Sequence, residues 1–162
     1  MSSGKERVRR FTSAYLYLTR RQCRSVLQVP FLNLMANLER RAGQVHIRVG
    51  GNTQETATLV PSTPDGRILE KDLSQLTNPT QTPPLIFTPE LIYMLANISS
   101  LVDVRWYLGV PFNDSANWRL GIVEAGQRIL GDKLLGLQAG NEPDLYVAHQ
   151  HRPSVSAFGM VS

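Results

Sequence analysis

Residues 134–145 read Leu-Leu-Gly-Leu-Gln-Ala-Gly-Asn-Glu-Pro-Asp-Leu, and the fold assignment starts from this stretch. The short apolar run from Leu134 to Ala139 predicts a buried β-strand. Pro143 lacks a backbone donor and restricts Glu142 to an extended or turn conformation, which keeps Glu142 at the strand's end. Barrels of the α/β class carry catalytic groups at the carboxyl ends of their strands. A polar strand-to-helix turn without chemistry explains the same residues equally well.

The preceding residues predict an alternation of helices and strands. Helices are expected where apolar residues recur every three or four positions, and strands where they alternate. The predicted order is a helix at Phe31–Ala42, a strand at Val45–Val49, a long loop at residues 53–87, a helix at Thr88–Val102, a strand at Val104–Val110, a helix near residues 120–130 and the strand at Leu134–Ala139. Crossovers between parallel strands are right-handed, so helices on one side and a parallel sheet are expected.

Length and composition limit this architecture. The chain has 162 residues, with 42% hydrophobic and 19% charged residues, as in globular proteins. A complete (β/α)8 barrel needs about 250 residues. The predicted fold is therefore a partial (β/α)8 TIM barrel of about three βα units within residues 28–162, and the chain is expected to be a fragment. No apolar run reaches the length of a membrane span, so no membrane partner is expected.

The positive charge is concentrated in a basic leader, residues 1–27. This leader holds seven basic residues and one acidic residue, or +6, whereas the remainder holds 10 basic and 12 acidic residues, or −2. The net charge of +4 therefore does not indicate a nucleic-acid partner. The leader lacks the apolar core of a secretory signal. It is either an unrelated upstream segment or an Arg-rich mitochondrial transit peptide.

Three segments in order resemble glycoside hydrolase family 79, which contains β-glucuronidases and is related to heparanase. The first reads His-Ile-Arg-Val-Gly-Gly-Asn-Thr-Gln-Glu (46–55). The second ends in Trp-Tyr-Leu-Gly-Val-Pro-Phe-Asn-Asp (106–114), and the third is Gly-Leu-Gln-Ala-Gly-Asn-Glu-Pro-Asp-Leu-Tyr (136–146). The resemblance extends from about residue 30 to about residue 154 and is strongest to fungal-type members. It implies a barrel hydrolase that acts on a β-glucuronide-containing glycan.

The resemblance also implies roles for single residues. Glu142 matches the family's catalytic acid/base, and Asn141 matches the residue that binds the sugar 2-hydroxyl. Arg48 matches an arginine that supports the nucleophile, and as a buried arginine it should pair with a carboxylate. Asn52 and Asn113 would line the substrate-binding rim. Asn113 also begins the sequon Asn-Asp-Ser, and a glycan there would compete with a role in the cleft.

The resemblance leaves one catalytic group unmatched. The family's nucleophile lies on a strand beyond the matched segments, and Glu55, Asp114 and Asp144 are interpreted as rim or turn carboxylates. No cofactor is expected, and no metal site, because His149 and His151 lack the further ligands of a recognisable zinc spacing. Relatives would be secreted, although an intracellular location is the alternative.

Two functions therefore remain open from the sequence. One is the amino-terminal part of a retaining β-glucuronidase-type hydrolase, with the acid/base but without the nucleophile. The other is a non-catalytic partial barrel with at most weak carbohydrate binding.

Overall fold

The computed structural model describes residues 27–74, 83–114 and 117–148. These residues form a mixed α/β structure with three helices, one parallel sheet and one smaller mixed sheet. The basic leader up to residue 26, His149 and His151 lie outside the described residues, so the predictions for them are not addressed by the structure.

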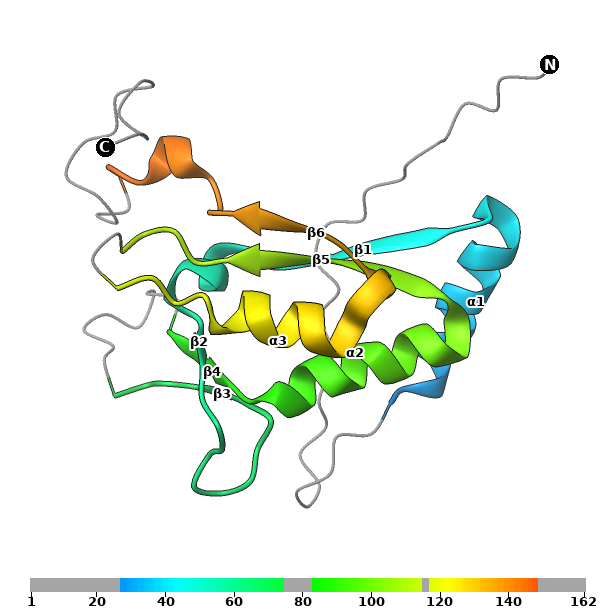
Figure 1. Ribbon diagram of the computed structural model, residues 1–162, viewed down its shortest axis with the longest axis horizontal. Coiled ribbons are helices and arrows are strands. Elements are labelled where there is room, and N and C mark those ends of the chain that lie inside the picture. Colours follow the sequence, from blue (N-terminus) through cyan, green and yellow to red (C-terminus); the bar gives the residue numbers. More distant parts are fainter. Residues whose placement is uncertain (1–26, 75–82, 115–116, 149–162) are drawn as a thin grey trace.

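The main sheet contains β1 (Val45–Val49), β5 (Val104–Val110) and β6 (Leu134–Ala139), with β5 in the centre (Figure 1). Both pairings are parallel, as predicted from the alternating pattern of the sequence. The carboxyl ends of the three strands therefore meet along one edge of the sheet. This edge is where the predicted site residues should gather.

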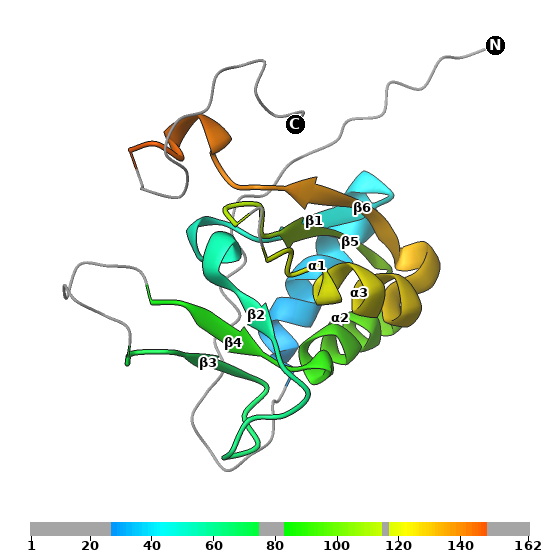
Figure 2. The same ribbon diagram turned by 60° about the vertical axis from the view of Figure 1, so that its left-hand side comes forward.

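The helices α1 (Val29–Ala42), α2 (Pro89–Val102) and α3 (Gly121–Leu130) cover one face of this sheet (Figures 1 and 2). Proline stands in the first turn of α1 and of α2, where the missing N–H costs nothing. Gly43 ends α1 with a φ of 80°, a conformation that glycine adopts without a Cβ penalty. The predicted helices are confirmed, and α1 begins two residues earlier than expected.

A buried hydrogen-bonded serine ties α2 to β5. The Ser99 hydroxyl donates to the Val104 carbonyl at 2.6 Å and accepts from the Trp106 indole N–H at 2.7 Å. Both side chains lie in the core between helices and sheet. The tryptophan can be buried in this core because Ser99 satisfies its one polar group.

The strand β6 is less buried than its apolar sequence predicted. Its residues are half-buried or exposed, and the side chain of Leu137 is 45% exposed. The reason is that β6 forms an edge of the main sheet within the part of the chain described here. Its hydrophobicity predicted the strand correctly but not its burial.

The predicted long loop contains a second sheet. Its strands β2 (Thr58–Leu59), β4 (Leu85–Phe87) and β3 (Leu69–Lys71) are two or three residues long, with β4 in the centre (Figure 2). The β2–β4 pairing is parallel and the β3–β4 pairing antiparallel. Strands this short show no measurable periodicity, and the prolines around them indicated a loop.

Three 3₁₀ helices follow turns in the chain: η1 (Asn52–Thr56) after β1, η2 (Gly131–Lys133) before β6, and η3 (Pro143–Leu145) after β6. The first and third begin at the edge where the parallel strands end. The first carries Asn52, Gln54 and Glu55, and the third begins directly after Glu142.

Candidate functional site

Four of the five predicted site residues meet at the carboxyl ends of β1 and β6. The Arg48 guanidinium donates from Nη2 to Oδ1 of Asn141 at 3.0 Å. The Asn141 amide in turn donates to Oδ1 of Asn52 at 3.3 Å. Glu142 is the next residue, and its exposed side chain lies beside this amide. The structure therefore joins residues that are 93 positions apart in the sequence.

The partner of Arg48 differs from the prediction. A carboxylate was expected, and within the described residues the hydrogen-bond partner is the amide oxygen of Asn141. Arg48 is only half-buried, so water can solvate the rest of its guanidinium. The arginine can therefore stay charged without a full ion pair.

The backbone of Glu142 is left-handed, with φ 51° and ψ 58°, and it starts a turn, one of the two conformations predicted for it. A residue with a Cβ rarely adopts this conformation and does so at some cost in energy. The Leu145 N–H donates to the Glu142 carbonyl at 2.9 Å and closes the turn. Strained residues of this kind cluster at functional sites, which makes Glu142 a candidate on structural grounds as well.

Glu55 is the residue that the sequence interpretation missed. It was taken for a rim carboxylate, but it is buried, with 1% of its surface exposed. Its Oε2 accepts the backbone N–H of Phe112 at 2.8 Å, and its Oε1 accepts the backbone N–H of Asn141. A buried carboxylate needs such charge-assisted hydrogen bonds. Glu55 thereby fixes the chain directly after β5 and directly after β6.

Asn113 joins this group indirectly. Its side-chain oxygen accepts from Nη2 of Arg119 at 2.6 Å, and the same Nη2 donates to the backbone carbonyl of Glu55. The sequence signal for Asn113 was its place shortly after β5. Arg119 was not predicted, because it stands in a segment with no recognisable motif.

Gln54 fills the space above the end of the sheet. Its amide Nε2 donates to the carbonyls of Val110 at 3.0 Å and of Gln138 at 3.1 Å, so it bridges β5 and β6. A Cβ at Gly109 would overlap the Gln54 side chain, and a Cβ at Gly50 would contact its Oε1 closely. A glycine inside a strand often marks such an approach, and Gly109 was the available sequence signal.

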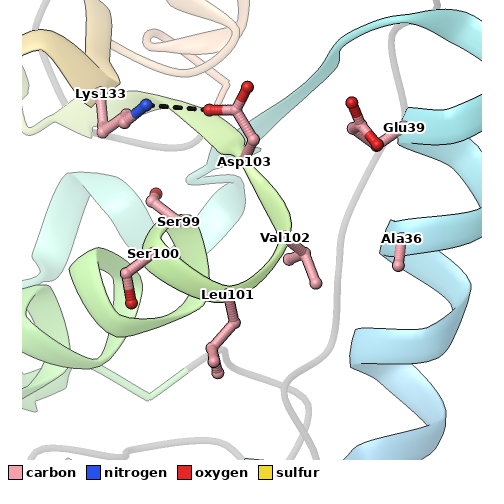
Figure 3. Close-up of a pocket in the computed structure, with 8 residues that line it drawn as sticks. All are labelled: Ala36, Glu39, Ser99, Ser100, Leu101, Val102, Asp103 and Lys133. Atoms are coloured by element: carbon pink, nitrogen blue, oxygen red, sulfur yellow. Dashed lines mark hydrogen bonds and ion pairs between the residues drawn. The ribbon is translucent and has the colours of Figure 1, made fainter.

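The described cavity lies at the other end of the sheet. Its volume is about 460 Å³, and it lies between α1 and the carboxyl-terminal end of α2 (Figure 3). The ion pair of Lys133 and Asp103, with 2.8 Å between Nζ and Oδ1, closes one side. Asp103 immediately precedes β5, so this cavity lies at the amino end of the strand, away from Glu142.

The described residues offer no group of three metal-ligating His, Cys, Asp or Glu side chains. Within the same ranges, no helix has the length and apolar character needed to cross a membrane. The carboxyl-terminal edge presents the exposed carboxyl groups of Glu142 and Asp144, the side-chain amides of Asn52 and Asn141, and the guanidinium of Arg48. These groups can hydrogen-bond sugar hydroxyls and can supply one proton.

No protein-family model matches the sequence, and no curated protein matches it.

Proposed function

We propose that the described residues form part of a (β/α) barrel and carry the acid/base half of a retaining β-glucuronidase-type active site. The observation that supports this most is the hydrogen-bonded row from Arg48 through Asn141 to Asn52, next to Glu142. The row lies at the carboxyl ends of parallel strands, which is the catalytic end of barrel enzymes. The resemblance of three sequence segments to glycoside hydrolase family 79 supports the same assignment.

Each residue of the proposed site has a defined task. Glu142 would protonate the glycosidic oxygen as the leaving group departs and would later accept a proton from water. Asn141 would hydrogen-bond the sugar 2-hydroxyl, a contact that strengthens in the transition state. Arg48 fixes the Asn141 side chain, because its guanidinium already holds the amide oxygen. The Asn141 amide N–H groups then point away from Arg48, and one of them contacts Asn52.

A retaining mechanism also needs a second carboxylate about 5–5.5 Å from the first. Glu55 does not suit this role, because it is buried and both its oxygens accept backbone N–H groups. Asp114 accepts hydrogen bonds from Asn117. We therefore propose that these 162 residues bind the sugar and supply the acid, without the nucleophile. The alternative proposal is a non-catalytic partial barrel with weak carbohydrate binding.

Titration with methyl β-D-glucuronide, followed by backbone amide NMR, tests the proposed site. The largest shifts are expected at Asn141 and Glu142, and they should saturate at millimolar sugar. Asn141→Ala should weaken this binding, because it removes the proposed sugar contact. Asn97→Ala is the matched control, since Asn97 is exposed on α2. Equal affinity of wild type, Asn141→Ala and Asn97→Ala would exclude the proposed site. The absence of a shift of the Asn141 amide signal in wild type would exclude it as well.

A further inference from the structure

An exposed tryptophan packs against Phe112, the second residue after β5. The rings of Phe112 and Trp118 are 4.8 Å apart between centroids and inclined at 59°. Trp118 is 46% exposed, whereas Trp106, the other tryptophan of the chain, is 1% exposed. An aromatic ring that packs against a neighbouring ring and remains half exposed can bind the apolar face of a ligand.

Phe112 connects this tryptophan to the strand end that carries Glu142. The backbone N–H of Phe112 donates to Glu55, which also accepts the Asn141 N–H. A Cβ built on Gly140 would lie 3.6 Å from the Phe112 Cβ, so this side chain packs against the residue directly after β6. Phe112 therefore contacts Trp118 with its ring and approaches the chain directly after β6 with its Cβ.

The segment after Trp118 is fixed as well. Arg119 donates to Asn113 at 2.6 Å and to the backbone of Glu55. The indole therefore packs on the Phe112 ring, and the hydrogen bonds of Arg119 fix the backbone that follows it. Rigid aromatic side chains bind with little loss of conformational entropy.

We propose that Trp118 is a stacking platform for a pyranose ring of a bound glycan. The axial C–H groups of a pyranose form an apolar face that matches the indole face in size. Trp118 packs on Phe112, and Glu55 holds the backbone N–H groups of Phe112 and Asn141 together, so the stacked ring would be a neighbour of the sugar held at Asn141. The proposal rests on the proposed function, and it extends that function from a monosaccharide site to an oligosaccharide site.

Acrylamide quenching of tryptophan fluorescence tests the platform directly. Trp106 is buried, so acrylamide quenches mainly Trp118 in the wild-type chain. A tetrasaccharide of alternating glucuronate and N-acetylglucosamine should lower the quenching constant at least twofold at saturation. Methyl β-D-glucuronide should leave this constant unchanged, because a single sugar at Asn141 does not reach Trp118.

Two variants provide the affinity measurement, with the amide shift of Asn141 as the readout. Trp118→Ala should weaken tetrasaccharide binding about two- to tenfold and leave the binding of methyl β-D-glucuronide unchanged. Tyr93→Ala is the control, because Tyr93 is an exposed aromatic residue on α2. It should change neither affinity, and the unfolding midpoint of each variant establishes that it is folded.

The outcomes separate the two proposals. The tetrasaccharide could shift the Asn141 amide signal without reducing the quenching of Trp118 and could bind Trp118→Ala as tightly as wild type. In that case the platform is wrong and the proposed site stands. If neither sugar shifts Asn141, both are wrong. Protection of Trp118 together with a selective loss of tetrasaccharide affinity supports the platform.

Discussion

The carboxylate of Glu55 accepts the backbone N–H of Asn141, which lies 86 residues later in the chain. Its second oxygen accepts the N–H of Phe112 at 2.8 Å. One buried side chain thus holds the second residue after each of two neighbouring strands in a fixed relation. The position of the Asn141–Glu142 turn depends on a residue that carries none of the proposed chemistry.

Glu55→Gln should destabilise the fold. The amide keeps one acceptor oxygen but places an NH₂ group against a backbone N–H, so one buried donor loses its partner. The expected cost is about 1–3 kcal/mol in the free energy of unfolding, measured by urea denaturation. Glu124→Gln makes the same chemical change on the exposed surface of α3 and should stay within about 0.5 kcal/mol of wild type. Equal stability of the two variants would contradict the role given to Glu55.

Ser99→Ala should also be costly. It leaves the Trp106 indole N–H without its acceptor in the core and removes the donor to the Val104 carbonyl. A loss of about 1–3 kcal/mol is expected, together with a change in tryptophan near-ultraviolet circular dichroism. Ser100→Ala, one residue along α2, removes only an exposed hydrogen bond to the Asn97 carbonyl. The free energy of unfolding of Ser100→Ala should be close to that of wild type. A greater loss of stability in Ser100→Ala than in Ser99→Ala would show that the Ser99 contact is unimportant.

The ion pair of Asp103 and Lys133 predicts a pH effect. The hydrogen bond from Lys133, reinforced by its charge, lowers the pKa of Asp103 in the folded protein. A lowered folded-state pKa means that the stabilisation is present above the ordinary value of about 3.9 and is lost as pH falls through the folded-state pKa. Both side chains are partly exposed, so the effect should stay below about 1 kcal/mol.

Asp103→Asn tests this ion pair. Asparagine tolerates the left-handed backbone of this position, where φ is 46°, so the substitution removes the charge and little else. The variant should lose stability at neutral pH and show a shallower loss of stability in acid. Asp132→Asn is the control, because Asp132 lies 3.9 Å from the same Lys133 Nζ and is largely exposed. A similar pH profile for Asp103→Asn and wild type would refute the assignment.

The sequence predicted the main elements well because their signals are local. Alternating apolar residues in Val104–Val110 and the proline at the start of α2 act within a few positions, and both predictions are confirmed. Sequence order and strand ends also predicted which polar residues lie near one another. Strand order predicted that Arg48, Asn52 and Asn141 would cluster, and the family resemblance supplied the roles of Arg48 and Asn141.

The features that were missed depend on distant partners. Glu55 has the sequence appearance of a surface carboxylate, and only the approach of Phe112 and Asn141 makes it a buried acceptor. Leu137 has the appearance of a core residue, yet its strand is an edge in the described structure. Burial is set by neighbours that are far away in sequence, and no local pattern records them.

The last prediction concerns catalysis by these 162 residues. We expect no enzyme-like hydrolysis of a chromogenic aryl β-glucuronide by the purified chain, because the covalent intermediate of a retaining route needs a nucleophile in addition to Glu142. Acid catalysis alone contributes only about 10²–10⁴-fold. The assay compares wild type with Glu142→Gln, and Glu124→Gln serves as the surface control. Rapid turnover that Glu142→Gln abolishes and Glu124→Gln preserves would show that a nucleophile does lie within this chain. Asp144→Asn would then be the first variant to identify it, because Asp144 is exposed two residues beyond Glu142.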